Sequence, residues 1–238
     1  EKEASEILTN LSEIENEFDF ENLEYDSSFE DLFFLVEKTL INKIGIDTAG
    51  KLHTGRSRND MEHTMFRIKL REKIISTIKD YFILCDILLK RSEKGLSEIV
   101  LLNTHGQPAQ VSTLAHFLSA VIEFSLRDIS RLLQSLNLVN LSPMGSAAIT
   151  TTGFPLSRER MAELLGFEGI VKNSYGAIAG CDYITTAYSS LKIGSINLGR
   201  FVQELITWTG FEVSQINVPD GFVQISSIMP QKRNPVPL

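Results

Sequence analysis

The chain has 238 residues, of which 43% are hydrophobic and 22% are charged. This composition is typical of globular proteins and excludes an intrinsically disordered chain or a disulfide-rich scaffold. Its two cysteines, Cys85 and Cys181, each lie in an apolar helical pattern and are predicted to be buried, reduced thiols. No cluster of cysteine and histidine residues predicts a zinc site.

Acidic side chains are concentrated at the start of the chain. Residues 1–37 contain 13 acidic residues and one basic residue, whereas residues 38–238 contain 17 acidic and 22 basic residues. The net charge of −7 argues against a nucleic-acid partner. The mildly cationic remainder suits a small anionic ligand, although solvated surface lysines are the simpler explanation. The uncharged stretches 99–122 and 132–157 are interrupted by polar residues, glycine and proline, so no membrane span is predicted.

The first third of the chain predicts helices separated by glycines. Residues 1–17 can form a polar helix, and residues 28–43 place apolar side chains near one helical face. Gly45 and Gly50 interrupt that pattern. The segment 51–60 is polar and poor in helix formers, so we expect a loop there.

Long helices are predicted for the middle of the chain. Residues 61–93 keep helical apolar spacing without proline or glycine, and Gly95 ends the pattern. A loop is expected over 102–111, with Ser112 as the N-cap of a helix that runs to about Asn137.

The last third contains the most apolar helix. Residues 141–155 predict a loop and residues 157–165 a short helix. Over 176–211 small and apolar residues occur on every side, as expected for a helix that is buried all round. Few other helices remain to cover it, so we expect partner subunits to do so. Period-two alternation is missing, and the predicted class is therefore an all-α oligomer of long helices.

Three polar segments could carry chemistry, and the first is HTGRSRND at residues 53–60. Arg56 and Arg58 could each bind a carboxylate through two N–H groups, and the following helix start offers free backbone N–H groups. The pattern therefore predicts a dicarboxylate site. A capped helix start, with Asp60 as the N-cap and solvated arginines, explains the same residues.

The second and third segments could supply proton transfer. In NTHGQPAQ (103–110), His105 could act as a general acid or base, or could be a hydrogen-bonded structural histidine. In SSIMPQKRNP (226–235), Ser226 could act as a base only if cations and N–H groups stabilise its alkoxide. Lys232 and Asn234 suit a developing oxyanion, although a polar surface loop is the alternative.

These segments carry a resemblance to a known family. The loop SSIMPQKRNP resembles the signature of the aspartase/fumarase superfamily. KLHTGRSRND (51–60), THGQPAQ (104–110) and LSPMGSAA (141–148), with the following SRERMAELLGF (157–167), resemble the argininosuccinate lyase and delta-crystallin branch, in the order of that family. The resemblance extends from about residue 28 to residue 238.

The resemblance implies a long-helix bundle of the fumarase/aspartase type, whose central helices form a tetrameric bundle. Each active site would be shared between three subunits of a homotetramer. Residues 1–58 would form an incomplete N-terminal helical region. Residues 59–238 would form the central bundle domain, truncated at its C-terminal side.

The resemblance also implies roles for individual residues. Ser226 would remove the Cβ proton of a succinyl group, Lys232 and Asn234 would stabilise the dianionic intermediate, and His105 would assist the leaving nitrogen or hold a carboxylate. The residues implied in substrate binding are Ser57, Arg58, Asn59, Thr104 and Gln107. No metal or organic cofactor is implied, because the substrate carboxylate is itself the electron sink.

The implied function is a cytoplasmic carbon–nitrogen lyase of arginine biosynthesis that eliminates fumarate from argininosuccinate and releases arginine. Two alternatives remain: a paralogue that acts on another N-succinyl amine, and a non-catalytic, crystallin-like homologue. Five positions depart from the branch, which has His, Asp, two acidic residues and Gly where this chain has Phe33, Met65, Gly176, Gly180 and Ile225. These differences concern the leaving amine, because the proposed proton-transfer residues are retained.

Overall fold

The computed structural model describes residues 1–24 and 26–238. Contacts between Cα atoms divide the chain into two compact units. The first unit contains residues 1–64 and 142–179, and the second contains residues 65–141 and 180–238. Each unit is thus built from two separate stretches of chain.

The first unit begins with α1 (Lys2–Glu17), α2 (Leu32–Ile44), α3 (Ile46–Ala49) and the 3-10 turn η1 (Gly50–His53). Its apolar cluster joins Ile7, Ile14, Leu40 and Ala49. The helix predicted for 28–43 starts later because Asp31 caps it, accepting a hydrogen bond from the Phe34 N–H at 3.1 Å. Gly45, with a φ of 77°, lies directly after the end of α2.

The second stretch of this unit contains β3 (Leu141–Ser142), α6 (Arg158–Leu164), β4 (Gly169–Ile170) and α7 (Ser174–Ala179). The short helix predicted for 157–165 is confirmed. Ser157 is its N-cap, because its hydroxyl oxygen accepts a hydrogen bond from the Arg160 N–H at 3.1 Å.

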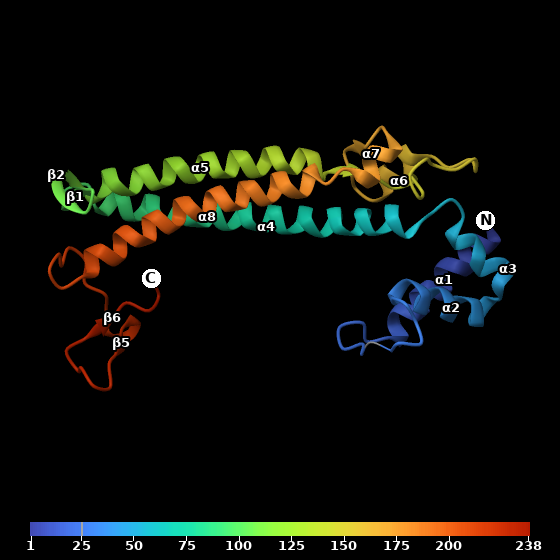
Figure 1. The fold of residues 1–238 in the computed structure, drawn as a ribbon, viewed down its shortest axis with the longest axis horizontal. Helices are drawn as coiled ribbons and strands as arrows, with labels where there is room; N and C mark the ends of the chain where they lie inside the picture. The colour runs from blue at the N-terminus through green and yellow to red at the C-terminus, as the bar shows by residue number, and fades with distance from the viewer. Residues whose placement is uncertain (25) are drawn as a thin grey trace. The chain divides into compact units, whose positions relative to one another are not determined.

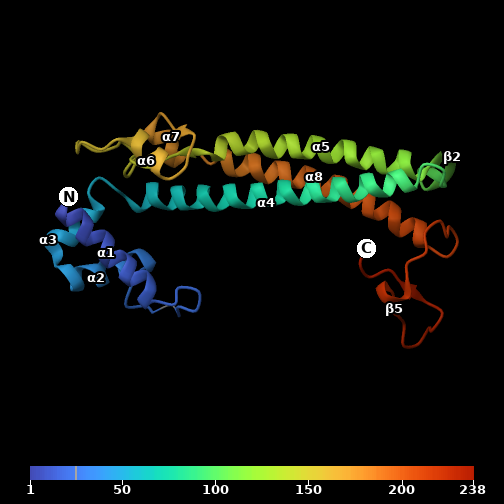
Figure 2. The same ribbon diagram turned by 180° about the vertical axis from the view of Figure 1, so that it is seen from behind.

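Three long helices form the body of the second unit: α4 (Arg58–Lys94), whose first turns belong to the first unit, α5 (Leu114–Val139) and α8 (Asp182–Thr209). They lie side by side in both views (Figures 1 and 2). At 37 residues, α4 is about 55 Å long. The structure thus confirms the predicted all-α class, and the described residues contribute only short two-stranded sheets.

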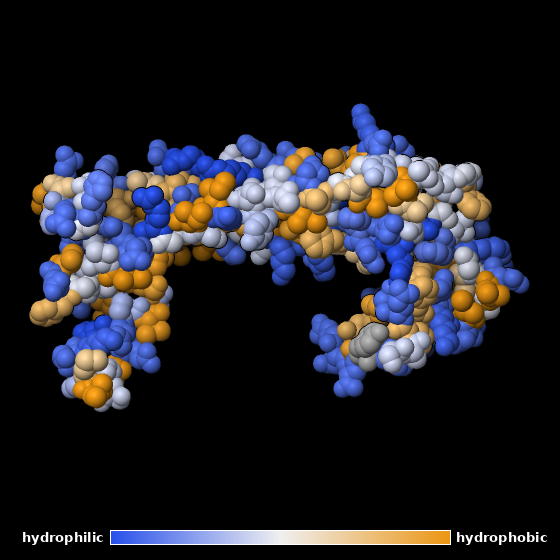
Figure 3. All heavy atoms as spheres, viewed as in Figure 1, coloured by the Kyte–Doolittle hydropathy of each residue, from blue (hydrophilic) through white to orange (hydrophobic). Residues whose placement is uncertain are grey.

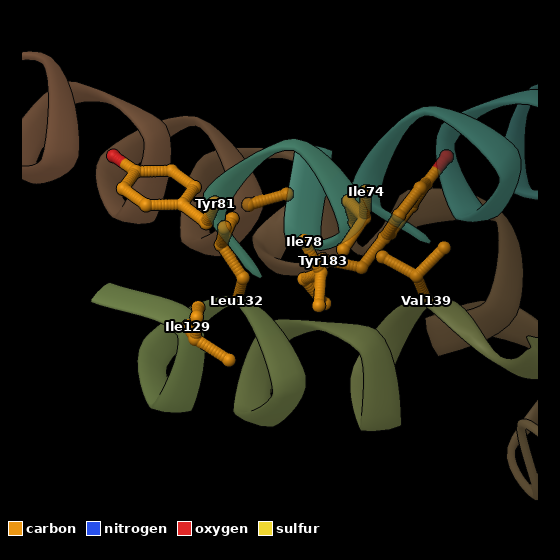
Figure 4. Packing of buried hydrophobic residues seen from close by; sticks show 8 residues of the cluster. Ile74, Ile78, Tyr81, Ile129, Leu132, Val139 and Tyr183 are labelled. Carbon is orange, nitrogen blue, oxygen red and sulfur yellow. The ribbon is translucent and has the colours of Figure 1, made fainter. Parts of the chain in front are cut away.

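The core of the three helices follows from their apolar periodicity (Figure 4). On α4, Ile74, Ile78 and Tyr81 recur at spacings of four and three, which places them on one face. Side chains of α5 and α8 complete this cluster, namely Ile129, Leu132 and Val139 from α5 and Tyr183 and Ala187 from α8.

A buried arginine also joins the three helices. Arg67 of α4 donates a hydrogen bond to the Leu138 carbonyl oxygen of α5 at 2.7 Å, and its guanidinium lies 3.6 Å from the ring centroid of Tyr183 on α8. Burial lowers the pKa of Arg67. No basic residue occupies the last turn of α5, so Arg67 supplies the positive charge that a helix C-terminus favours.

Two segments differ from the prediction. The loop expected over 102–111 is largely a hairpin, in which β1 (Ile99–Thr104) pairs with β2 (Gln107–Thr113). The N-cap of α5 is Thr113 rather than Ser112, because the Thr113 hydroxyl accepts the hydrogen bond from the His116 N–H at 3.2 Å.

The helix predicted over 176–211 is interrupted. α7 ends at Ala179 and α8 starts at Asp182, so Gly180 and Cys181 lie between them. Cys85 is buried as predicted, but Cys181 is exposed because it lies at this interruption rather than inside a helix. Among the residues that the structure describes, no helix is long and apolar enough to cross a membrane.

The end of the second unit is mostly irregular. It contains the 3-10 turn η2 (Asp220–Phe222) and the short pair of β5 (Gln224–Ile225) with β6 (Arg233–Asn234). In this pair Gln224 faces Asn234 and Ile225 faces Arg233.

A close approach between α4 and α8 makes one glycine essential. A Cβ atom added to Gly194 would collide with the Tyr81 hydroxyl and would lie 3.7 Å from the Asp128 Cγ. Asp128 is fully buried and accepts hydrogen bonds from Asn197 and from Arg131. The collision would therefore disturb a buried polar network as well as the packing.

We predict that Gly194→Ala lowers the free energy of unfolding by about 1–3 kcal/mol, because the core has no room for the added methyl group. On the same helix, a Cβ atom added to Gly199 meets nothing within 4 Å. Gly199→Ala is thus the matched control and should raise stability by up to about 1 kcal/mol through helix propensity. Urea unfolding followed by circular dichroism would measure both, and equal effects would contradict the packing argument.

Candidate active site

The first unit contains a pocket of about 660 Å³ at the predicted dicarboxylate segment. This volume is in the range of small-molecule sites. The walls come from α2, from the segment before α4 and from the loop after β3. The lining residues are Phe33, Phe34, Glu37, His53, Gly55, Arg56, Ser57, Arg58, Asn59, Ala147, Ala148, Thr151 and Thr152.

The start of α4 is held by reciprocal capping. The Ser57 hydroxyl oxygen accepts a hydrogen bond from the Asn59 N–H at 3.3 Å, and the Asp60 carboxylate accepts one from the Ser57 N–H at 3.0 Å. This is the arrangement of a capping box, in which two otherwise free backbone donors are satisfied. Asp60 was expected as the N-cap, but Ser57 takes that position and Asp60 lies in the first turn.

Asp60 also holds the loop that forms the opposite wall. Its second carboxylate oxygen accepts hydrogen bonds from the Gly145 N–H at 3.1 Å and the Ala147 N–H at 2.8 Å. The side chain is fully buried, so these contacts replace the water that a carboxylate loses on burial. The Asn59 amide adds a hydrogen bond to the Ala148 carbonyl oxygen at 3.3 Å.

Arg158 fixes the same loop from its other side. Its guanidinium donates hydrogen bonds to the Ser146 hydroxyl at 3.0 Å and to the carbonyl oxygens of Val171 and Lys172 at 2.8 and 3.1 Å. Gly145 has a φ of 83°, and a Cβ atom there would lie 2.8 Å from the Arg158 Cγ. The loop therefore needs glycine at this position both for its backbone angle and for space.

The two arginines of the segment differ in their partners. The Arg58 guanidinium donates hydrogen bonds to Asp31 at 2.5 Å and to Glu30 at 3.0 Å, and its Cζ lies 5.2 Å from the Phe34 ring centroid. The carboxylates raise the pKa of Arg58 by these hydrogen bonds. Burial lowers the pKa of Arg56, and the charge of Asp60 partly opposes this effect.

The second polar segment lies at the tip of the β1–β2 hairpin in the second unit. His105 and Gly106 have φ values of 53° and 73°, as a two-residue hairpin turn with both central residues in the left-handed region requires. Thr104 ends β1 and Gln107 starts β2, so the turn presents the three predicted residues together.

The third segment lies beyond α8. The Ser226 hydroxyl oxygen accepts a hydrogen bond from the Met229 N–H at 3.1 Å, and the Lys232 N–H donates one to the Met229 carbonyl oxygen at 2.9 Å. These bonds fold the loop so that its serine and its lysine both contact Met229. Lys232 lines a pocket of about 500 Å³, and Asn234 lies in β6.

The predicted site residues thus form three groups. Ser57, Arg58 and Asn59 line the pocket of the first unit. The hairpin residues and the loop of Ser226 belong to the second unit.

Several residues that shape these groups escaped the sequence analysis. Gln215 binds the edge of β1 through its side chain, accepting from the Leu101 N–H at 2.6 Å and donating to the Leu101 carbonyl oxygen at 3.0 Å. Glu37 carries no motif signal, and Arg158 lies in a segment that resembles the branch but was given no role. The spacing of Ser57 and Asp60 is the pattern of a capping box and could have identified the role of Asp60.

The remaining departures from the branch lie outside the pocket that Phe33 lines. Met65 is exposed, and the Gly176 N–H donates a hydrogen bond to the Asn173 side chain at 2.9 Å at the start of α7. Ile225 is exposed in β5. Phe33 is therefore the departure with a direct place in the pocket, where its ring centroid lies 4.8 Å from that of His53.

Comparison with protein families decides the relationship. The model of a family described as lyase matches residues 1–238. The chain belongs to this lyase family. Argininosuccinate lyase 2 of Agrobacterium fabrum is 49% identical over 99% of the chain and 47% of its own length. Argininosuccinate lyase of Methanocaldococcus jannaschii is 40% identical over 98% of the chain and 48% of its own length. The chain therefore spans about half the length of the curated relatives it matches.

Solved structures of lyases share the fold of this lyase-family chain. EDDS lyase in complex with formate superposes with a TM-score of 0.90, at 32% identity over 98% of the chain and 46% of that structure. A class II fumarase from Schistosoma mansoni, 17% identical over 84% of the chain and 50% of that structure, has a TM-score of 0.65. The fold is that of the fumarase/aspartase superfamily, as the loop motifs predicted.

We predict that Asp60→Asn lowers the free energy of unfolding by about 1–3 kcal/mol, because the amide group turns one acceptor into a donor that faces backbone N–H groups. Amide hydrogen exchange should accelerate at Gly145 and Ala147. Glu62→Gln, an exposed change in the same helical turn, is the control. It should alter neither the free energy of unfolding nor the hydrogen exchange at these two amides. Unchanged exchange in the Asp60 variant would show that the loop does not depend on this carboxylate.

Proposed function

We propose that the full-length protein is a cytoplasmic carbon–nitrogen lyase of arginine biosynthesis that cleaves argininosuccinate into arginine and fumarate. The observation that carries this proposal is the 49% identity to argininosuccinate lyase 2 of Agrobacterium fabrum over 99% of the chain. The three polar segments lie within the matched region. The retention of Ser226, His105, Lys232 and Asn234 argues against a non-catalytic homologue.

The chemistry assigned to these residues is an elimination. Ser226, as its alkoxide, removes the Cβ proton of the succinyl group, and the electron pair is delocalised into the adjacent carboxylate. Lys232 and Asn234 stabilise that dianion, which is bound more tightly than the substrate. The electron pair then forms the double bond of fumarate as the C–N bond breaks, and His105 assists the leaving nitrogen or holds a carboxylate.

Substrate binding is assigned to the two other segments. Ser57, Arg58 and Asn59 would contact the dicarboxylate in the pocket of the first unit, and Thr104 and Gln107 would approach it from the hairpin of another subunit. In the ligand-free chain, Arg58 is paired with Asp31 and Glu30, so substrate would have to compete with these carboxylates or use the remaining N–H groups.

We assign the complete site to a homotetramer in which three subunits contribute one segment each. Exposed apolar side chains on the long helices support this assembly, because water-exposed patches of this kind favour burial against another chain (Figure 3). They include Phe82, Ile83 and Ile87 on α4 and Tyr188 and Ile196 on α8. The predicted division at residues 58 and 59 would then separate the region that precedes the long helices from the bundle.

A second candidate is an enzyme that removes another amine from an N-substituted aspartate. The match to EDDS lyase, at 32% identity, favours it. Fumarate release from argininosuccinate and from a panel of N-succinyl amines, followed by ultraviolet absorbance, separates the two. Activity with argininosuccinate supports the first candidate, and activity with another amine alone supports the second. Release from no substrate would contradict both.

We predict that Ser226→Ala lowers kcat of the full-length enzyme by at least about a hundredfold, because no other group replaces the base. The sedimentation profile should stay that of the unaltered protein, since Ser226 lies in a loop outside the long helices. Ser227→Ala, which changes the neighbouring exposed hydroxyl, is the matched control. Unaltered turnover in the Ser226 variant would show that another residue is the base.

A further inference from the structure

The pocket of the first unit contains two charged side chains that the capping and pairing contacts leave unused. Arg56 and Glu37 both line it, and among the described residues neither side chain has a hydrogen-bond or ion-pair partner. Two other charged side chains near the pocket, by contrast, have partners. Arg58 forms ion pairs with Asp31 and Glu30, and Asp60 accepts hydrogen bonds from backbone N–H groups.

Arg56 is the unpaired cationic side chain of the pocket wall among the described residues. Its guanidinium is partly buried and stays protonated, although burial lowers its pKa, because an arginine begins from a very high value. The nearest carboxylate, Asp60, is occupied by the N–H groups of Ser57, Gly145 and Ala147. The planar N–H groups of Arg56 therefore suit a ligand carboxylate.

Glu37 is the unpaired acidic side chain of the pocket wall among the described residues. It lies on α2 three and four residues after Phe34 and Phe33, which is the spacing of neighbours on one helical face. The Phe33 ring packs against the His53 ring with 4.8 Å between centroids, and this contact holds the Phe33 ring in the pocket wall. Aromatic rings beside a carboxylate are the combination that favours a planar cation such as a guanidinium.

We infer that this pocket binds a fumarate or succinyl carboxylate at Arg56 and the guanidinium of the leaving amine at Glu37, against the Phe33 ring. This inference rests on the proposed function. It makes Glu37 the residue that causes the pocket to bind a cationic amine more tightly than a neutral one. Glu30 and Asp31 cannot take that role while Arg58 occupies them.

The experiment uses the full-length protein and two matched probes. L-arginine and L-citrulline have nearly the same shape, but the first ends in a guanidinium and the second in a neutral urea group. Calorimetric titration at saturating fumarate should give the unaltered protein at least a tenfold lower Kd for L-arginine. Glu37→Gln should remove this preference by raising the Kd of L-arginine, with that of L-citrulline unchanged.

Two further variants test the remaining contacts. Phe33→Leu should raise the Kd for L-arginine more than the Kd for L-citrulline, because it removes the aromatic ring but keeps an apolar side chain. Arg56→Gln should raise the Kd of fumarate at least tenfold without changing the ratio of the two amino acids at saturating fumarate. Glu15→Gln, an exposed change on α1 outside the pocket, is the charge-matched control and should change none of these values.

Three results would overturn the inference. The first is an equal Kd of the unaltered protein for L-arginine and L-citrulline, and the second is an equal rise of both Kd values in the Glu37 variant. The third is an unchanged Kd for fumarate in the Arg56 variant. Circular dichroism of each variant separates loss of binding from loss of folding. Cleavage of argininosuccinate is measured separately. Cleavage combined with an unaltered preference in Glu37→Gln would contradict this inference and leave the proposed function standing.

Discussion

The carboxylate of Asp60 is the interaction on which the candidate site depends. It is fully buried and accepts hydrogen bonds from three backbone N–H groups, one at the start of α4 and two in the loop after β3. A buried carboxylate without such partners would cost several kcal/mol, so the helix start and the loop are held at fixed positions relative to it. Ser57, Asn59 and Ala147 acquire their places in the pocket wall from this arrangement.

Charge pairing then decides which side chains remain available to a ligand. Arg58 is shared between Asp31, which also caps α2, and Glu30. Arg56, two residues earlier, has no such partner among the described residues and keeps its N–H groups free. The difference between the two arginines is one of surroundings, because the side chains are chemically identical. It leaves Arg56 as a cationic side chain of the pocket wall that is available to a ligand.

The second unit follows a different physical principle. Its three helices are joined by apolar periodicity, with Tyr81 fitted against Gly194 and Arg67 bound to the end of α5. This packing uses one face of each helix and leaves apolar side chains such as Phe82 and Tyr188 exposed. The hairpin of His105 and the loop of Ser226 lie at the ends of these helices, where tight turns rather than helical packing set their conformation.

The sequence alone determined the local features of this protein. Apolar spacing predicted the long helices, glycines marked the breaks, Ser157 predicted a helix start, and the loop motifs indicated the superfamily fold. These features depend on neighbouring residues, whose effects are visible in a short window of sequence. Only the tertiary structure decided that residues 142–179 belong with residues 1–64, that Thr113 rather than Ser112 caps α5, and that Arg58 is paired while Arg56 is not. Those outcomes depend on groups far apart in the chain or on competing hydrogen bonds of similar strength, and periodicity contains no information about either.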